Sequence, residues 1–171
     1  MQPDISSWPN KFFYGCKLKN AVECSDKFPF HSYRILNLIT NQNHDNSNNE
    51  EADFVANIIY CMLNFANLDN WQSCISCGIL TPYNNQRAMI LSKVNAKISS
   101  LPENVKRKIK YIVDTVDRFQ GQECDVIILS CVRSQKIGFL SDRQRLCVAL
   151  TRAKHSLIIC GNFNIFMVYP N

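Results

Sequence analysis

Apolar residues in this chain gather into short, nearly continuous runs separated by polar or helical stretches. Three of the runs are rich in β-branched residues, which is typical of strands buried on both faces of a sheet. A shorter run and one segment near the start predict two more strands. The five segments are Arg34 to Ile39, Ile75 to Thr81, Tyr111 to Val116, Asp125 to Val132 and Ser156 to Cys160. The pattern indicates a doubly wound α/β fold, with a mainly parallel sheet and helices on both faces.

A polar stretch and then a helix follow the first predicted strand. Residues 41–49 are rich in asparagine and have no apolar face to bury, so they predict an exposed loop. From about Glu50, apolar residues recur at helical spacing. Asn48 and Glu51 have the spacing of a capping box, in which each side chain bonds the backbone of the other residue. We therefore expect a helix that begins where the asparagine-rich loop ends.

Two further helices are expected between the strands. Thr81-Pro82 combines a capping hydroxyl with a proline at the first helical position, which predicts a helix that ends near Ser99. Ser141 and Gln144 have capping-box spacing and open another helix before the last strand. Residues 1–33 alternate aromatic and turn residues, and we interpret them as a covering segment. We place one domain at residues 34–171, since a chain of 171 residues with 46% hydrophobic content is long enough to bury one core.

Charge and hydropathy narrow the class of protein only a little. The formal net charge of +5 permits a nucleic-acid partner without requiring one. No run of about twenty apolar residues occurs, and the start lacks the basic and then apolar pattern of a secretory signal. We therefore expect a soluble, intracellular protein with no membrane partner.

Nine cysteines are scattered along the chain, several of them inside apolar runs, where a reduced thiol packs as a small hydrophobe. Cys74 and Cys77 have the spacing of metal ligands. A tetrahedral zinc site needs four ligands, however, and neither a second such pair nor a pair of histidines follows. We expect no metal site. A zinc or redox domain built on these two cysteines stays as an alternative hypothesis, beside the two functions given below.

The sequence lacks a phosphate cradle of its own. A Walker A loop contains two glycines five positions apart, followed by lysine and a hydroxyl residue. The five glycines stand at positions 15, 78, 121, 138 and 161, and no pair has that separation. No Asp-Glu pair closes a strand as a magnesium-binding Walker B would. Any nucleotide chemistry therefore needs another domain to supply the phosphate cradle and the magnesium ligand.

Three polar clusters fall near the ends of predicted strands: residues 81–87, residues 115–123, and the helix region with Arg145 and Arg152. Ligands of open parallel sheets bind outside the carboxyl ends of the strands, so the clusters can converge on one edge. The two arginines are about two helical turns apart, which predicts that both guanidiniums leave one helix face. Paired guanidiniums suit phosphate oxygens. The alternative is a solvated basic edge paired with Asp142 or Asp125.

Several of these segments match the motifs of a known family in the same order. They are Gly78 to Arg87, Val113 to Asp125, Ile127 to Ser134, Ile137 to Leu140 and Arg145 to Lys154. The first resembles motif IV, and the others resemble motifs V and VI, of superfamily 1 helicases of the nonsense-decay and senataxin group. Gln2 to Asn10 is similar to the end of the segment that closes the first motor domain in that family.

This resemblance spans nearly the whole chain, and Lys27-Phe-Pro-Phe-His31 is most similar to senataxin-like members. It implies that the chain begins where the first motor domain stops. It also implies that residues 34–171 form a second RecA-like domain carrying motifs IV, V and VI. Such a domain has a P-loop NTPase-type fold without its own P-loop.

ATP lies between two RecA-like domains in that family, and the resemblance implies which residues of this chain reach it. Arg152 matches the arginine finger of motif VI, and Glu123 matches a glutamate used near the ribose and phosphates, so both are candidate catalytic residues. Gly121 permits close approach of the backbone. Gln122 stands where the family usually has arginine, and Arg145 is either a second phosphate or inter-domain contact or a helix-surface ion pair. ATP and Mg²⁺ are expected to be bound mainly by the first domain.

Motifs IV and V of the family grip the nucleic-acid backbone, which nominates six residues here. They are Thr81, Pro82, Tyr83, Asn84, Arg87 and Thr115. Hydroxyls and backbone amides at helix starts are suitable phosphate donors. The implied partners are single-stranded RNA or DNA, along which the family moves 5′ to 3′, and the N-terminal RecA-like domain of the same parent protein. Gln86 is a candidate for contacts between the domains.

Two functions remain compatible with these residues. One is the second motor domain of an ATP-dependent helicase, inactive in isolation because half of its site lies in another domain. The other is a degenerate RecA-like module that binds nucleic acid or a protein and hydrolyses nothing. Gln122 supports the second function, as does Cys147, which replaces the asparagine usual before Val148-Ala-Leu-Thr-Arg152. The senataxin-like resemblance favours the nucleus over the cytoplasm.

Overall fold

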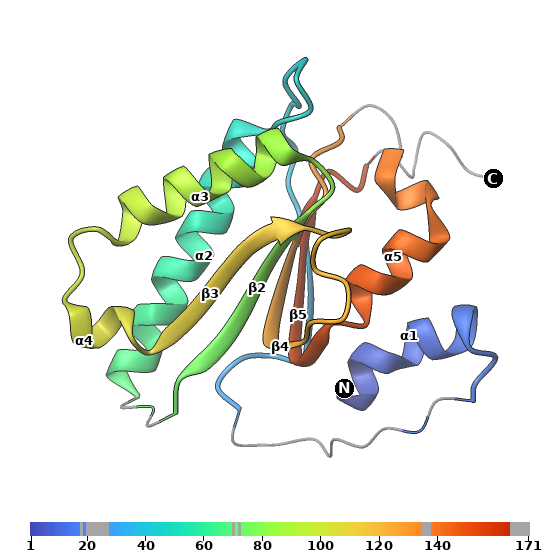
Figure 1. Cartoon of the computed structure of the whole chain (residues 1–171), viewed down its shortest axis with the longest axis horizontal. Coiled ribbons are helices and arrows are strands. Elements are labelled where there is room, and N and C mark those ends of the chain that lie inside the picture. The colour runs from blue at the N-terminus through green and yellow to red at the C-terminus, as the bar shows by residue number, and fades with distance from the viewer. Residues whose placement is uncertain (18, 20–27, 70, 72, 135–137, 165–171) are drawn as a thin grey trace.

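Five strands form one sheet in the computed structural model, which describes residues 1–17, 19, 28–69, 71, 73–134 and 138–164 (Figure 1). The strands are β1 (Tyr33–Asn37), β2 (Ile75–Thr81), β3 (Ile109–Thr115), β4 (Cys124–Ser130) and β5 (Ala153–Gly161). Their order across the sheet is β1-β5-β4-β2-β3, and every pairing is parallel. The predicted parallel sheet is therefore confirmed.

Helices cover both faces of the sheet (Figure 1). They are α1 (Pro3–Phe13), α2 (Asn49–Leu68), α3 (Asn84–Ile98), α4 (Glu103–Lys106) and α5 (Arg143–Leu150), with a short 3-10 helix at Gly138–Ser141. Helices α2, α3 and α4 lie on one face, and α1 and α5 lie on the other. This arrangement confirms the doubly wound α/β class.

The central strands contribute to two hydrophobic cores, one on each face of the sheet. Side chains alternate along a strand, so Ile79 and Ile128 join the core that includes residues of α2 and α3. Their neighbours Leu80 and Ile127 join the core that includes residues of α5. All four are fully buried. This two-sided burial explains why the strands appear in the sequence as continuous apolar runs.

The predicted start of α3 is wrong. Thr81 does not cap this helix, because it is the last residue of β2 and pairs with Thr115 of β3. The backbone carbonyl of Thr81 accepts a hydrogen bond from the N–H of Val116 at 3.1 Å, which keeps the residue within the sheet edge. Tyr83 occupies the cap position, although its side chain makes no capping hydrogen bond, and the helix begins at Asn84.

The predicted cap of α5 is also wrong. Asp142 caps the helix, because its Oδ1 accepts hydrogen bonds from the N–H groups of Gln144 and Arg145, both at 3.1 Å. Ser141 belongs to the preceding 3-10 helix, where its hydroxyl donates to the carbonyl of Gly138 at 2.7 Å. A carboxylate at a helix start also interacts favourably with the helix dipole, which favours Asp142 at this position.

Helix α1 was missed in the expected covering segment. Its eleven residues include two prolines and three aromatic residues, which weaken the helical signal. Ile5 nevertheless belongs to the same core as residues of α5, and the N–H of Gln2 donates to the carbonyl of Lys154 at 3.0 Å. Trp8 and Phe12 remain about half exposed and line a pocket together with Leu129 and Ile159 of the sheet. The helix therefore packs on the sheet through a narrow apolar stripe.

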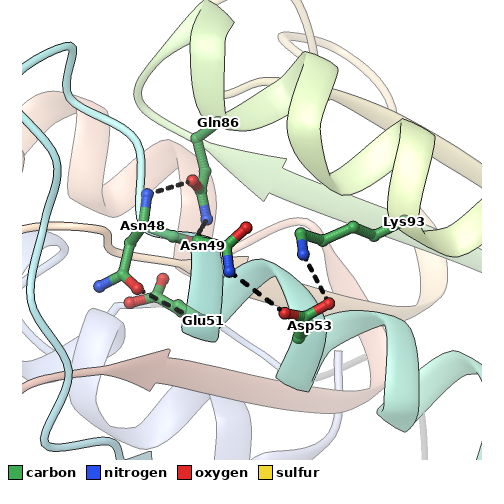
Figure 2. A network of polar contacts seen from close by, with 6 residues as sticks. All are labelled: Asn48, Asn49, Glu51, Asp53, Gln86 and Lys93. Carbon is green, nitrogen blue, oxygen red and sulfur yellow. Dashed lines mark hydrogen bonds and ion pairs between the residues drawn. The ribbon is translucent and has the colours of Figure 1, made fainter.

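The start of α2 carries a buried polar network (Figure 2). Asn48 caps the helix, because its side-chain oxygen accepts from the N–H of Glu51 at 3.0 Å. The return half of the expected capping box is absent, since the N–H of Asn48 donates to the side chain of Gln86 at 2.7 Å. The Glu51 carboxylate accepts instead from the Ser130 hydroxyl at 2.5 Å and the Val132 N–H at 3.0 Å. Glu51 therefore turns inward and joins α2 to the end of β4.

An ion pair between α2 and α3 lies close to the same helix start (Figure 2). Asp53 of α2 accepts a hydrogen bond from Lys93 of α3 at 2.6 Å, but the Asp53 side chain is 54% exposed. Such an exposed ion pair stabilises a fold by at most about 1 kcal/mol. The asparagine-rich loop before the helix has no regular structure, as expected, yet Ser47 and Asn48 at its end are fully buried. The loop is therefore anchored at the point where α2 begins.

Burial raises the pKa of Glu51 to about 7, because the charged carboxylate loses its hydration. The hydrogen bonds from Ser130 and Val132 offset only part of this effect. The second carboxylate oxygen, Oε2, has no hydrogen-bond partner among the residues that the structure describes. Burial also raises the pKa values of the neighbouring Cys131 and Cys160 thiols, and the Glu51 charge raises them further. The network thus holds a carboxyl group that titrates near neutral pH.

Glu51→Gln is expected to flatten the pH dependence of stability between about pH 4.5 and 7. The folded chain binds the Glu51 proton more tightly than the unfolded chain, because folding raises its pKa from 4.5 to about 7. The stability that this proton provides is complete below pH 4.5 and is lost as the pH rises through 7, by about 2 to 3 kcal/mol. Urea denaturation across this range measures the loss. Glu50→Gln, at an exposed neighbour, should keep the wild-type slope, and a Glu51→Gln variant that also keeps it contradicts the burial account.

Candidate nucleotide and nucleic-acid sites

The nucleic-acid candidates begin at the carboxyl edge of the sheet, where β2 and β3 end. Thr81 and Thr115 are the last residues of these strands and stand opposite each other in the ladder. Thr81 is fully buried and Thr115 is 6% exposed. The Thr81 hydroxyl has no hydrogen-bond partner within the described ranges of the chain. Buried hydroxyls are normally bonded, so an unpaired one at a strand end is consistent with a ligand-binding edge.

The turn from β2 into α3 adds three more candidates to this edge. Pro82 is buried, Tyr83 is half-buried and Asn84 is exposed. The Tyr83 hydroxyl accepts a hydrogen bond from Nε of Arg133 at 2.9 Å, and the Arg133 guanidinium lies 5.2 Å from the centre of the Tyr83 ring. That distance is within cation–π range. Arg133 was missed by the sequence analysis, because the pattern of a strand end does not indicate which way the next side chain turns.

Two residues near the start of α3 are engaged within this domain. Nε of Arg87 donates to the carbonyl of Val113 at 3.1 Å and pairs with Asp114 at 3.2 Å, while its side chain stays 32% exposed. Gln86 is fully buried, and its amide both donates to and accepts from the backbone of Asn48. The assignment of Gln86 to contacts between domains is therefore wrong, because its amide faces inward.

The ATP-site candidates Glu123 and Arg152 lie at the opposite edge of the sheet. Glu123 immediately precedes β4, and Arg152 immediately precedes β5. The N–H of Cys124 donates to the carbonyl of Arg152 at 3.1 Å, so the two strand starts are paired neighbours. The polar clusters therefore do not converge on one edge. Parallel strands all begin at the same edge, so the chain crosses back before β4 and again before β5 (Figure 1).

The loop that returns to this edge presents Gly121, Gln122 and Glu123 to solvent. Gly121 has a φ of +81°, a left-handed conformation that favours glycine. A Cβ at this position would meet no atom within 4 Å. The backbone conformation therefore explains the glycine, and the space around it is open to a ligand.

Arg145 forms a bidentate ion pair on the surface of α5. Its Nε and Nη2 donate to the two carboxylate oxygens of Asp117, both at 2.8 Å, and its guanidinium lies 5.1 Å from the centre of the Phe139 ring. Of the two roles expected for Arg145, the ion pair is thus present in the structure. The partner differs from the expected one, because Asp142 caps α5 and Asp125 bonds the Ser76 hydroxyl.

Arg152 has different surroundings from Arg145. Helix α5 ends at Leu150, so the prediction that both arginines leave one helix face is wrong. Nε of Arg152 donates to the carbonyl of Val148 at 3.0 Å, and Nη2 lies 3.2 Å from the Thr151 hydroxyl. No carboxylate in the described part of the chain pairs with Arg152. The side chain is held by the end of its own helix and keeps further N–H groups for another acceptor.

Tyr14, which follows α1, lies beside this arginine and was not indicated by the sequence. The Cys147 thiol donates to the Tyr14 hydroxyl at 3.5 Å. The pKa of Tyr14 is raised, first by this hydrogen bond and then by burial, while the positive charge of Arg152 lowers it. Cys147, which replaces the asparagine of the family motif, thus has a partner of its own in Tyr14, the residue after α1.

Metal-binding and membrane-spanning features were not found in the described residues. No three or more His, Cys, Asp or Glu side chains there are grouped as metal ligands. Cys74 is exposed, whereas Cys77 is buried in β2, and burial raises the pKa of the Cys77 thiol. A zinc ligand must be a thiolate, which this burial disfavours. None of the described helices is both long and apolar enough to cross a bilayer.

A parallel sheet in this order, with helices on both faces, polar clusters at two edges and no Walker A glycine pair in its sequence, defines a doubly wound α/β domain. Comparison with family models shows that the chain belongs to the AAA domain family, whose model matches residues 1–164. A solved structure of the C-terminal domain of a possible DNA helicase from Lactobacillus plantarum has a TM-score of 0.49 and 11% identity, covering 92% of this chain and 83% of that chain.

Relatives of this chain come from both the nonsense-decay group and the senataxin group. The Regulator of nonsense transcripts 1 homolog of Drosophila melanogaster is 36% identical over 95% of this chain, and the ATP-dependent helicase NAM7 of Saccharomyces cerevisiae is 36% identical over 95%. The Probable helicase senataxin of Homo sapiens is 34% identical over 98%. The chain spans only 14%, 18% and 6% of these proteins, respectively. The resemblance is confirmed, the chain is a helicase-family domain, and the similar identities do not separate the two groups.

Gly121→Ala is expected to lower the free energy of unfolding by about 1 kcal/mol. Alanine is strained at a φ of +81°, and no neighbouring atom adds a steric clash. Chemical denaturation of the purified chain measures the difference. Gly121→Asn is the matched variant and should lose less, because asparagine tolerates the left-handed region. Wild-type stability in Gly121→Ala would show that the loop does not need this backbone conformation.

Proposed function

We propose that this chain is the second motor domain of an ATP-dependent helicase and that Arg152 acts as its arginine finger. One observation carries the proposal: Arg152 and Glu123 flank the paired starts of β5 and β4, and Arg152 has no carboxylate partner among the described residues. Arg145, by contrast, is bound to Asp117. An arginine that is positioned but not neutralised is suited to a phosphate supplied by another domain.

The nucleotide in this proposal is ATP with Mg²⁺, held mainly by a preceding RecA-like domain. That division of labour follows from the absence of a Walker A glycine pair in this sequence. Arg152 stabilises the negative charge that develops on the transferred phosphoryl group, a contribution worth roughly three orders of magnitude or more in rate. Glu123 and the exposed backbone of Gly121 lie on the ribose and phosphate side, with Gln122 in place of the arginine usual in the family.

The carboxyl edge is proposed to grip the backbone of single-stranded RNA or DNA. Thr81, Thr115 and the backbone amides at the start of α3 offer neutral donors to phosphates, and Tyr83, Asn84 and Arg87 lie on the same edge. Contacts of this kind ignore base identity, which suits a protein that moves along a strand. We infer movement in the 5′ to 3′ direction from the family resemblance.

The two proposed sites are connected by rigid strands. β4 has seven residues and therefore separates the edges by about 23 Å. Because its side chains are packed in both cores, the sheet is expected to move as one body against the first domain. ATP contacts at one edge then displace the nucleic-acid contacts at the other.

A degenerate binding module is the second candidate function. Gln122, which is exposed at the nucleotide edge, removes a charge that the family usually places there. In that case the carboxyl edge binds a nucleic-acid strand or a protein, and no ATP is hydrolysed.

We place the helicase inside the cell and in the nucleus, on the basis of the senataxin-like resemblance.

Arg152→Ala is expected to abolish nucleic-acid-stimulated ATP hydrolysis when this chain is joined to its preceding motor domain. The reduction should be at least about a thousandfold in kcat, because the lost guanidinium acts on the transition state, while ATP binding persists. A coupled ATPase assay and a nucleotide-binding titration measure the two quantities. The isolated chain should show no hydrolysis.

The exposed Arg107, at the end of α4, supplies the matched control. Arg107→Ala removes the same charge shortly before the start of β3, which is two positions across the sheet from β4, and should leave kcat unchanged. Undiminished hydrolysis in Arg152→Ala rules out the finger assignment. A two-domain protein that binds single strands but never hydrolyses ATP supports the binding module instead.

A further inference from the structure

The chain makes a left-handed turn immediately after β4. Val132 has a φ of +71°, a conformation that β-branched residues rarely adopt, and it is 1% exposed. Such a conformation persists only where the surrounding structure determines it. The turn lies at the carboxyl edge, so whatever holds it also determines what the next residues present there.

Side chains from the start of α2 hold both polar backbone groups of Val132. Its N–H donates to the Glu51 carboxylate at 3.0 Å, and its carbonyl accepts from Nδ2 of Asn48 at 3.3 Å. Two residues later, Ser134 is bonded in both directions to Gln42 of the asparagine-rich loop, at 3.1 and 3.2 Å. The segment after β4 is therefore attached at successive positions to the chain that enters α2.

The turn directs Arg133 toward the proposed nucleic-acid edge. The Arg133 guanidinium lies over the Tyr83 ring at 5.2 Å, and its Nε donates to the Tyr83 hydroxyl at 2.9 Å. No carboxylate in the described ranges forms an ion pair with Arg133. Arg133 thus brings a positive charge to the edge where Thr81 and Thr115 end their strands.

We propose that Arg133 contacts a phosphate of the bound single strand and that Glu51 is the positioning residue that fixes it there through the turn at Val132. The proposal rests on the nucleic-acid binding proposed for this edge. Glu51 is fully buried and does not itself touch the strand. Its carboxylate acts by accepting hydrogen bonds from the Val132 N–H and the Ser130 hydroxyl. A shorter or apolar side chain cannot accept both hydrogen bonds.

Binding of labelled oligo(dT) and oligo(U) to the whole chain, measured by fluorescence anisotropy over a range of salt concentrations, tests the two roles. Arg133→Ala is expected to weaken binding roughly tenfold and to reduce the salt slope by about one, as loss of one phosphate contact does. Glu51→Ala should produce the same two changes. The double variant should bind no more weakly than either single variant, because both substitutions remove one contact.

Matched variants separate positioning from general stability. Glu51→Gln keeps an acceptor oxygen and should restore the affinity and the salt slope. Glu51→Asp keeps the charge but shortens the side chain, so it should weaken binding and serves as the test where Glu51→Ala does not fold. Glu50→Ala, at the exposed neighbour, should bind as the wild type does.

Each outcome of this titration has a defined meaning. Wild-type affinity in Arg133→Ala or in Glu51→Asp overturns the inference and leaves the proposed function standing. Losses that add in the double variant also overturn it, because they assign Glu51 a role independent of Arg133. If the wild-type chain binds neither oligonucleotide, the nucleic-acid part of the proposed function is overturned, and the inference falls with it. That result differs from the two above, in which the wild-type chain binds and only a variant departs from expectation.

Discussion

All five strands run in the same direction, and this single constraint arranges every candidate site in the molecule. Each connection must carry the chain from the carboxyl edge back to the amino edge before the next strand begins. Residues that end a strand, such as Thr81 and Thr115, therefore meet at one edge. Residues that precede a strand, such as Glu123 and Arg152, meet at the other. One packed sheet thus joins two sites that have different chemistry.

The buried network around Glu51 shows how the carboxyl edge is kept in a defined shape. Strand ends are free of ladder partners, so their backbone groups need other acceptors. Glu51 and Asn48 supply them to the turn after β4, and Gln86 ties the same helix start to α3. The cost is a carboxyl group without full hydration, whose pKa rises to about 7. The helix start of α2 is therefore part of the edge, although it lies distant from it in the sequence.

Much of the fold could be predicted from the sequence, because strands buried on both faces of the sheet appear as continuous apolar runs. The run Ile75 to Thr81 became β2 with the predicted bounds, and the Asn48 cap of α2 was confirmed. Helix α1 was missed because its prolines and aromatic residues hide the helical period. The cap assigned to Thr81 was wrong because pairing with β3 outweighs a local capping preference.

The site was harder to predict than the fold, because the sequence shows order along the chain but not direction in space. The motifs nominated Arg152 as the arginine finger but left Arg145 open between a phosphate or inter-domain contact and a surface ion pair, and only the structure shows that Asp117 binds Arg145. Glu51 fitted a capping box by spacing, and its inward rotamer depends on donors at Ser130 and Val132, far away in the chain. Arg133 lies in the motif-like segment Ile127 to Ser134 but was assigned no role there, because its position depends on that distant carboxylate.

A structure of the two-domain protein with a phosphoryl-transfer transition-state analogue, Mg²⁺ and a short single strand tests the central claim most directly. The account predicts that the Arg152 guanidinium leaves the Val148 carbonyl and donates hydrogen bonds to the analogue at the amino edge. It also predicts that strand phosphates lie along the carboxyl edge near Thr81 and Thr115. An analogue bound while Arg152 still donates to the Val148 carbonyl, or a nucleic-acid strand bound at the amino edge, would contradict the account.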